Sequence, residues 1–306
     1  MVDSSLLLPP LLSGIILGSL YALMAMGLTL IYSTIRVLNF AHGAFFMAGA
    51  YVVWWLNTPS SSLYGTSLPT SGLAVPLALA VVPAVLVIFG VGVGTQRFMI
   101  RPLIRKANPL ITTLVATLAL ATVFESVATV FFGGARVQFA SEIATGDIRY
   151  GGLIVTYAQL VQFAVAIGVL VLLQVFLKRS RLGIGMRAVA QDLDAASLCG
   201  INTDTIYLLA FGLGSALAAV AGFLLTNTVF LSPSAGAAPL TIAFIVVVFG
   251  GIGSVQGTIL ASYIVALVQQ YVTLFLDATW GLSFAFVLMI AVLIIRPQGL
   301  FGFRET

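Results

Sequence analysis

Few side chains in this sequence could carry chemistry, and they do not form a catalytic set. The chain contains one histidine, His42, and one cysteine, Cys199. Neither residue can build a metal centre or an intrachain disulfide alone, because a zinc site needs several protein ligands and a disulfide needs two thiols. The sequence also lacks a constellation of nucleophile, base and metal ligands. We therefore expect no catalytic residue, no metal site and no cofactor in this chain.

Glu125 is a carboxylate within a long apolar run, Pro109–Phe132. It lies roughly 7 Å from the middle of that run at about 1.5 Å per residue. An ionised carboxylate at this depth is costly unless it is paired or hydrated. Two interpretations stay open: Glu125 lines a substrate path and meets a polar or cationic group, or it makes a structural hydrogen bond to a serine or threonine of a neighbouring helix. No second intramembrane charge forms a proton relay with it, which argues against ion-coupled transport.

Two irregular segments interrupt the apolar runs, one in each half of the chain. The first, Ser33–Gly43, places Arg36, Asn39 and His42 at the mouth of an apolar helix. The second, Gly250–Gly257, reads GGIGSVQG. Irregular backbone at membrane depth is tolerated where it is buried in protein or lines a cavity, and paired interrupted segments mark transport paths. The alternative is a tight loop at the membrane interface, and for His42 we favour a half-buried interfacial imidazole that hydrogen-bonds the turn over a pH switch.

These segments and the intramembrane carboxylate define a candidate translocation path. Its residues are Asn39, His42, Gly43, Glu125, Gly250, Gly251, Gly253 and Ser254. The segment Gly250–Gly257 lacks the Lys-Ser/Thr ending of a P-loop, and its third glycine is one position late for a dinucleotide fingerprint. It therefore predicts no nucleotide site.

The composition determines which elements can position these residues. Of 306 residues, 60% are hydrophobic and 7% are charged, whereas a soluble domain has about 25% charged residues. The 13 Lys and Arg and 9 Asp and Glu cannot cover a soluble surface of this size. The sequence therefore predicts a polytopic membrane protein surrounded by lipid, and it excludes a soluble enzyme, a nucleic-acid-binding domain and a secreted disulfide scaffold.

Apolar runs of about 20 residues predict membrane-spanning helices. Runs near that length are Leu6–Ile31, Val37–Leu56, Gly72–Gln96, Pro109–Phe132, Gly152–Leu177, Thr205–Thr226 and Ser254–Leu276. Two runs are shorter, Pro239–Phe249 and Leu282–Ile295. Because the apolar residues are continuous rather than alternating, the fold class is all-α, with eight or nine helices. The short runs are candidates for half-helices or re-entrant segments.

We expect a single transmembrane domain, 1–306, whose halves, 1–150 and 151–306, form a weak two-fold repeat around the two glycine-rich breaks. Small residues recur at four-residue spacing in two runs, as Gly14, Gly18 and Ala22 and as Gly214, Ala218 and Gly222. Such stripes let helices approach closely. We expect them to pack helices within one subunit, and a subunit interface is the alternative.

Basic residues cluster in two loops, Gln96–Asn108 and Lys178–Asp204. Two spans separate the loops, so both lie on one face, and the positive-inside rule makes that face cytoplasmic. The segment Asn57–Ser71 has no Lys or Arg and fits the opposite face. We expect an N-terminus outside and a cytoplasmic C-terminus. Since Met1–Leu8 lacks the basic region of a signal peptide, we also expect an uncleaved first span.

The loop 178–204 is suited to contact with another protein. Apolar residues recur at helical spacing, namely Met186, Val189, Ala190, Leu193, Ala196 and Cys199. Gly200 fits a helix stop, and the stretch from Asn202 to Thr205 can cap the next helix. Such a helix can dock in a partner's groove or lie in the lipid interface. No loop is long enough for a catalytic domain, so the energy for transport must come from an ion gradient or another polypeptide.

Several stretches resemble the LivH-type permease family of ABC importers. Asp194-Ala195-Ala196 followed by Gly200 is similar to the E-A-A-x-x-x-G motif of ABC importer permeases. Gly27–Tyr51, with its N-F-A-H-G, resembles the N-terminal signature of the LivH type, and Asp192–Asp204 resembles its coupling loop. Val248–Gly257 and Arg296–Leu300 are similar to its glycine-rich segment and its usual ending. The resemblance covers almost the whole chain in the right order.

The resemblance implies a permease subunit of an ABC importer for branched-chain amino acids in the bacterial inner membrane. It implies a LivM-like permease subunit, two cytoplasmic ATPase subunits that hold ATP and Mg²⁺, and an extracytoplasmic substrate-binding protein as partners. The family also includes permeases for urea, short amides and other amino acids, so the substrate stays open. The residues implied to couple to the ATPase are Arg187, Asp192, Asp194, Ala195, Ala196 and Gly200.

The sequence departs from the family pattern at two positions. At Glu125 the family more often has Gln, which points to a different polarity of the path. Asp194 replaces Glu and shortens the acidic arm by one methylene. Two rival functions are an ion-coupled secondary transporter and a channel. This sequence has no intramembrane charge network, which argues against the first, and no repeated pore motif, which argues against the second.

Overall fold

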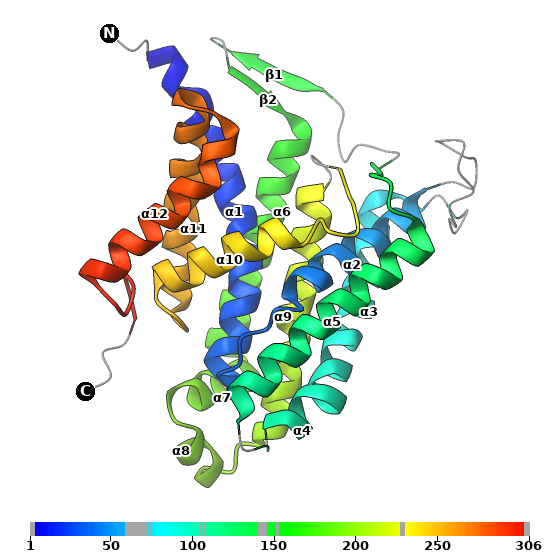
Figure 1. Cartoon of the computed structure of the whole chain (residues 1–306), viewed down its shortest axis with the longest axis vertical. Helices are drawn as coiled ribbons and strands as arrows, with labels where there is room; N and C mark the ends of the chain where they lie inside the picture. The colour runs from blue at the N-terminus through cyan, green and yellow to red at the C-terminus, as the bar shows by residue number, and fades with distance from the viewer. Residues whose placement is uncertain are drawn as a thin grey trace.

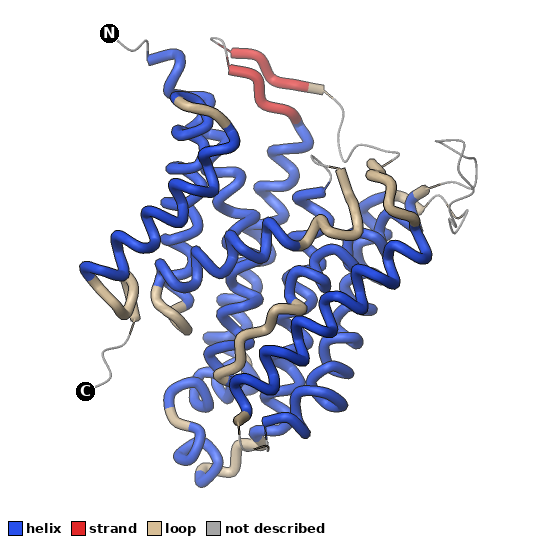
Figure 2. The backbone as a smooth tube through the Cα atoms, viewed as in Figure 1, coloured by secondary structure: helices blue, strands red, loops and turns tan. Residues whose placement is uncertain are grey.

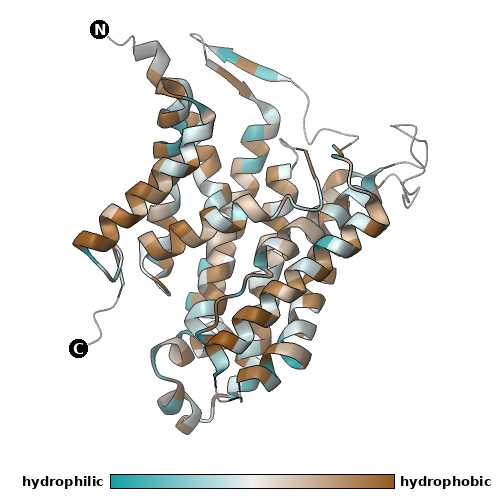
Figure 3. Cartoon of the chain, viewed as in Figure 1, coloured by the Kyte–Doolittle hydropathy of each residue, from teal (hydrophilic) through white to brown (hydrophobic). Residues whose placement is uncertain are grey.

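The computed structural model describes residues 4–58, 73, 75–104, 106, 108–139, 146–150, 153–226 and 230–302. This part of the chain is a bundle of α-helices with a short two-stranded hairpin at one end (Figures 1 and 2). Apolar residues dominate the long helices, and polar residues gather in the first strand of the hairpin and at the opposite end (Figure 3). The predicted all-α membrane class is confirmed.

Seven helices of the described residues are long and apolar enough to cross a membrane. They are α1 (Ser4–Ile35), α3 (Leu77–Thr95) continued through the π-helical η1 (Gln96–Ile100) and α4 (Arg101–Ile104), α5 (Pro109–Phe132), α6 (Tyr157–Arg179), α9 (Thr203–Thr226), α11 (Val255–Phe275) and α12 (Ala278–Ile295). Two shorter helices lie among them, α2 (His42–Asn57) and α10 (Ala237–Gly250). The short helices α7 (Arg181–Gln191) and α8 (Leu193–Leu198) lie at one end of the bundle (Figure 1).

α1 and α9 form the centre of the bundle. In their apolar stretches, 83% of the α1 residues and 78% of the α9 residues are buried inside the chain, against 11% for α5 and α12. α1 packs against α6, α9, α10 and α11, and α9 also packs against α2 and α3. The apolar outer faces of α5 and α12 are therefore left for lipid or another subunit.

The small-residue stripes pack helices within the subunit, as predicted. A Cβ atom at Gly18 of α1 would lie 2.7 Å from the Tyr263 ring of α11. A Cβ atom at Gly222 of α9 would lie 2.1 Å from the carbonyl oxygen of Phe46 in α2. Real Cβ contacts essentially never fall below 3.0 Å, so only glycine permits these helix approaches.

The break after α1 is longer than the sequence suggests. The prediction of one span over Val37–Leu56 is wrong, because residues 36–41 form no helix and α2 begins at His42. Arg36 ends α1 with φ at 60°, in the left-handed region. Asn39 then turns the chain, with its Oδ1 accepting the Ala41 N–H at 3.1 Å. The 16 residues of α2 cover only about 24 Å, less than the roughly 30 Å of the hydrocarbon core.

Two further boundaries differ from the predictions. The run Leu282–Ile295 is not short: it belongs to the 18-residue α12, which Asp277 caps through the Thr279 N–H at 2.9 Å. The run Gly152–Leu177 is not wholly helical, because β2 (Leu153–Thr156) pairs antiparallel with β1 (Asp147–Tyr150). The β-branched residues 154–156 favour a strand, and a capping box at Thr156 then starts α6.

A buried pair of hydroxyls joins α1 to α11. The Oγ1 atoms of Thr29 and Thr258 lie 2.8 Å apart, and both residues are fully buried. Because the Thr258 hydroxyl donates to the Ser254 carbonyl at 2.8 Å, the Thr29 hydroxyl donates to Thr258.

We expect Thr258→Val to lower the free energy of unfolding by about 1–3 kcal/mol, because the Thr29 donor is left buried without an acceptor. Adding Thr29→Val should recover most of this loss, because valine has the shape of threonine and removes the unpaired group. Unfolding midpoints in detergent test both statements. A double variant as unstable as the sum of the two single variants would contradict this account.

Candidate functional site

The N-terminal ends of α2 and α10 meet inside the bundle, backbone against backbone. A Cβ atom at Gly43 would lie 2.6 Å from the Gly236 carbonyl oxygen, and one at Gly236 would lie 1.9 Å from that of Gly43. About two turns further along α10, the ring of Phe244 lies 4.8 Å from that of Phe40. We call the contact between Gly43 and Gly236 the α2–α10 junction. Gly43 was a predicted path residue, and its partner Gly236 was not.

Asn39 and His42 lie beside the junction, and both are fully buried. The His42 Nε2 lies 3.0 Å from the Met24 carbonyl of α1, and it donates because a carbonyl can only accept. The predicted half-buried imidazole that bonds its own turn is therefore wrong, because α1 covers the ring. Neither His42 Nδ1 nor Asn39 Nδ2 has a partner among the described residues. Such buried atoms cost free energy until a polar group reaches them.

α5 holds the segment before α2 but does not bring Glu125 to the junction. The Phe40 N–H donates to Thr117 Oγ1 at 3.2 Å, and Thr117 is fully buried. Glu125 lies about 12 Å further along α5, at about 1.5 Å per residue. It is half-buried, and no hydrogen bond or ion pair among the described residues involves its carboxylate. Both interpretations of Glu125 remain predictions.

The second predicted break, between α10 and α11, is a compact turn. Gly251 and Gly253 have φ values of 101° and 85°, which glycine adopts without strain. Gly250 packs directly on Gly257, whose Cβ atom would lie 2.0 Å from the Gly250 carbonyl oxygen. Ser254 caps α11 by accepting the Gly257 N–H at 3.1 Å.

The chain after α12 closes over this turn. The N–H groups of Leu300 and Phe301 donate to the carbonyls of Phe249 and Gly250, both at 3.0 Å. Gly250 and Gly251 are buried in this contact, so they serve backbone packing. The 14 residues of α10 place this turn about 21 Å from the α2–α10 junction. The predicted path residues thus form two groups, with Glu125 apart from both.

A cavity of about 880 Å³ opens beside the turn at the end of the bundle that carries α7. Gly253 and Ser254 line it, together with Arg36 and Arg187. The cavity therefore joins one group of predicted path residues to one of the predicted coupling residues.

Arg36 connects α7 to the first break. Its Nη2 donates to the Ala190 carbonyl, in the last turn of α7, at 3.1 Å. The following residues, 37–41, lead directly to the α2–α10 junction. This hydrogen bond therefore connects α7 to the chain segment that carries Asn39. The sequence placed Arg36 at the helix mouth but gave no signal of this contact, which joins residues 154 positions apart.

The predicted coupling segment is two helices rather than one. Asp192 ends α7 and caps α8, with its Oδ1 accepting the Ala195 N–H at 3.0 Å. Gly200 stops α8 with φ at 79°, as predicted. Asn202 caps α9 as predicted, with its Oδ1 accepting the Thr205 N–H at 3.1 Å.

The interruption at Asp192 changes which side chains are covered. Of the predicted coupling residues, Ala196 is buried, whereas Arg187, Asp192, Asp194, Ala195 and Gly200 are exposed. Leu193 and Cys199, expected on the apolar face with Ala196, are exposed as well. Leu198, which the sequence did not single out, is 90% exposed. α8 therefore presents apolar side chains to the outside.

The base of α9, next to α8, is held by an ion pair between Arg101 of α4 and Asp204. Asp204 lies in the first turn of α9, where the helix dipole favours a negative charge. This pair ties the end of the α3–α4 helix to α9.

Comparison with known proteins identifies the family. Residues 11–293 match the family described as branched-chain amino acid transport system / permease component. The chain belongs to this family. The resemblance seen in the sequence is confirmed, and the members of the family are transport permeases rather than enzymes.

Full-length relatives agree with this assignment. The permease is 33% identical over 305 residues to the high-affinity branched-chain amino acid transport system permease protein BraD of Pseudomonas aeruginosa, covering 98% of this chain and 97% of the relative. It is 32% identical over 304 residues to LivH of Escherichia coli K12, covering 98% and 96%. A probable LivH of Methanocaldococcus jannaschii is 27% identical, covering 94% and 90%. No solved structure matches the chain.

Proposed function

We propose that this permease moves branched-chain or related amino acids inward across the bacterial inner membrane, as one subunit of an ATP-driven importer. The similarity to BraD and LivH over nearly the full length of each chain supports this substrate class. Urea or a short amide is the alternative substrate within the family, and the relatives favour amino acids. The observation that carries the mechanism is the hydrogen bond from Arg36 to Ala190, because it joins the exposed α7–α8 segment to the broken helix.

ATP hydrolysis takes place in partner subunits in this proposal. The partners are a LivM-like permease, two cytoplasmic ATPases that hold ATP and Mg²⁺, and an extracytoplasmic substrate-binding protein. α8 docks in a groove of an ATPase, since its exposed Leu193 and Leu198 offer apolar side chains at the end of the bundle.

The proposed orientation places α7 and α8 in the cytoplasm, the N-terminus outside and the C-terminus inside. Figure 1 shows α4, α7 and α8 at one end of the bundle. Basic side chains concentrate in these helices and in the last turn of α6, as Arg101, Lys178, Arg179, Arg181 and Arg187. The positive-inside rule supports a cytoplasmic location for that end.

Transport then proceeds by alternating access. ATP binding draws the ATPases together and displaces α8 and α7. Arg36 passes this displacement to residues 37–41, and the α2–α10 junction shifts relative to the turn at the other end of α10. A bundle with two irregular backbone regions suits such rocking motions.

Replacing Gly200 with tryptophan tests the coupling site. A Cβ atom at Gly200 would meet nothing within 4 Å, so the indole has space within the subunit, although the φ of 79° strains any residue other than glycine. We expect Gly200→Trp to reduce amino-acid uptake by the reconstituted complex about tenfold or more, the middle of the usual range for coupling between sites, while ATP hydrolysis continues. Gly200→Asn is the control, because asparagine tolerates a positive φ.

Leu198→Glu is a second variant that leaves the backbone unstrained. It places a charge on the apolar surface of α8 and should uncouple uptake in the same way. Uptake at the normal rate by well-expressed Gly200→Trp and Leu198→Glu variants would show that the ATPase docks elsewhere.

A further inference from the structure

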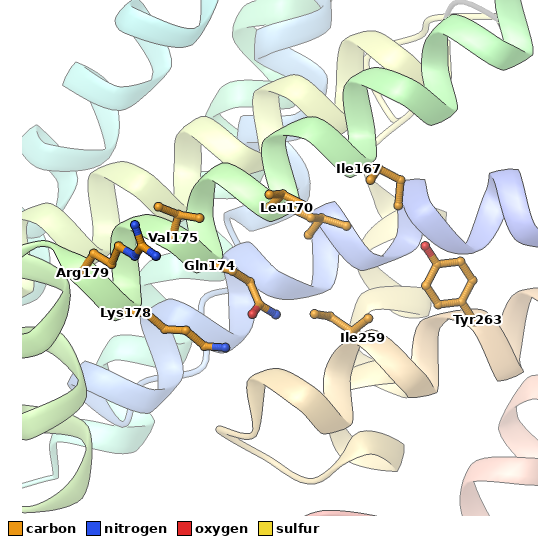
Figure 4. A pocket seen from close by; sticks show the side chains of 9 residues that line it. Ile167, Leu170, Gln174, Val175, Lys178, Arg179, Ile259 and Tyr263 are labelled. Atoms are coloured by element: carbon orange, nitrogen blue, oxygen red, sulfur yellow. The ribbon is translucent and has the colours of Figure 1, made fainter.

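A second groove, separate from the cavity at α7, runs between α6 and α11 and has a volume of about 450 Å³. Both helices pack on α1, and Figure 4 shows Gln174 and Lys178 of α6 extending toward Ile259 of α11, with the guanidinium of Arg179 directed away from Ile259. The walls are apolar, formed by Ile167, Leu170, Val171, Val175 and Ile259, and the ring of Tyr263 closes one end. Val171 and Val175 are exposed, so the groove opens toward the lipid.

The opposite end of the groove is basic. Lys178 and Arg179, in the last turn of α6, line it, and no acidic residue does. Neither cation takes part in an ion pair or a side-chain hydrogen bond within the described residues. One turn before Lys178, the amide of Gln174 extends into the groove near Ile259 (Figure 4). An apolar channel thus ends in two cations without a counter-charge.

The distances along α6 between the apolar, amide and basic side chains match the distances between the acyl chain, the ester carbonyls and the phosphate of a phospholipid. From Ile167 to Lys178 the helix rises about 16 Å, close to the roughly 15 Å hydrocarbon depth of one leaflet. Gln174 lies about 6 Å before Lys178 along the axis, where ester carbonyls follow a phosphate group. Its amide can donate to such a carbonyl, and basic clusters between transmembrane helices attract lipid phosphates.

We propose that the α6–α11 groove binds an anionic glycerophospholipid. One acyl chain lies between Ile259 and the valines of α6, and the phosphate lies between Lys178 and Arg179. A phosphatidylcholine can fill the same apolar walls, but it brings a choline cation close to two protein cations. The groove therefore prefers phosphatidylglycerol to phosphatidylcholine.

Lipid retention on the full chain, purified in mild detergent with the subunits that accompany it, tests this proposal. Native mass spectrometry after mixing with equal amounts of phosphatidylglycerol and phosphatidylcholine should show the former retained in preference. Lys178→Gln with Arg179→Gln should reduce that retention about tenfold or more, given the attraction of each cation for an anionic headgroup. The control pair, Arg97→Gln with Arg181→Gln, removes the same charge outside the groove and should retain the lipid.

Val171→Trp fills the groove without touching its charges, and Val171 is 56% exposed, so the fold accommodates the ring. This variant should lose both lipids alike. Unfolding midpoints confirm that each variant is folded. The proposal fails if the unaltered chain shows no preference, if the Lys178 and Arg179 pair retains phosphatidylglycerol as before, if the control pair loses it equally, or if Val171→Trp changes nothing.

Discussion

Gly236→Ala is expected to destabilise this permease by about 3 kcal/mol or more, at or above the upper end of the usual cost of overpacking. The added Cβ atom would lie 1.9 Å from the Gly43 carbonyl oxygen. That oxygen belongs to the backbone of α2, so no side-chain rotation relieves the clash. Gly236 has φ at −80°, which any residue adopts, so the cost arises from space alone. Parting the helix ends would also disturb Asn39 and His42.

The controls are glycines whose Cβ atoms would meet nothing within 4 Å, such as Gly90 in α3 and Gly168 in α6. Gly90→Ala and Gly168→Ala should keep or slightly raise the unfolding midpoint, since alanine favours a helix by about 1 kcal/mol over glycine. Gly43→Ala should resemble Gly236→Ala. Combining these two changes should cost less than their sum, because both act on one contact. Equal midpoints for Gly236→Ala and Gly168→Ala would contradict the close packing of the junction.

The features that sequence reasoning found are those that local sequence controls. The apolar runs gave the long helices, Gly200 stopped α8 because its conformation needs glycine, and Asn202 capped α9 through its own side chain. The close helix packing at Gly18 and Gly222 was also predictable, since small residues repeated at four-residue spacing let membrane helices approach closely.

The features that it missed depend on contacts between distant residues. Gly236 follows a polar, loop-like stretch and gives no sign that it meets Gly43. The sequence around His42 is the same whether this helix end lies at the membrane interface or inside the bundle. The contact of its ring with α1 shows that His42 is buried. The prediction of one continuous helix failed at Asp192, whose side chain caps a new helix, α8. The side chains of α8 that are buried therefore differ from those predicted. The sequence therefore identified the irregular segments of the candidate path, but it did not predict how these segments are arranged in space.

The predicted path residues form two separate groups, at the α2–α10 junction and at the glycine-rich turn, so the mechanism depends on how the two groups are connected. The junction and the glycine-rich turn lie at opposite ends of α10, so in the proposed mechanism a displacement of α7 has to reach both. Arg187 of α7 and Gly253 of the turn line the same cavity. In the proposed mechanism the displacement reaches the junction through Arg36, whose guanidinium donates to the Ala190 carbonyl of α7. Removing that guanidinium separates the two routes.

Arg36→Ala is accordingly expected to reduce uptake by the reconstituted complex about tenfold or more, within the range of coupling between two sites. ATP hydrolysis should continue, because the variant leaves α8 and its exposed surface unchanged. The physical reason is loss of the hydrogen bond to Ala190. Measuring substrate uptake and phosphate release on the same proteoliposomes gives the ratio of transport to hydrolysis, which should fall.

Arg36→Gly separates the side chain from the backbone. A left-handed conformation costs a non-glycine residue about 1–2 kcal/mol, so Arg36→Gly should be more stable than Arg36→Ala by about that amount. Both should lose uptake alike if the guanidinium transmits the motion. Arg97→Ala, which removes another exposed charge from the same end of the bundle, should transport normally. Restored uptake in Arg36→Gly would show instead that the left-handed bend alone positions α2, and that α7 acts only through the glycine-rich turn.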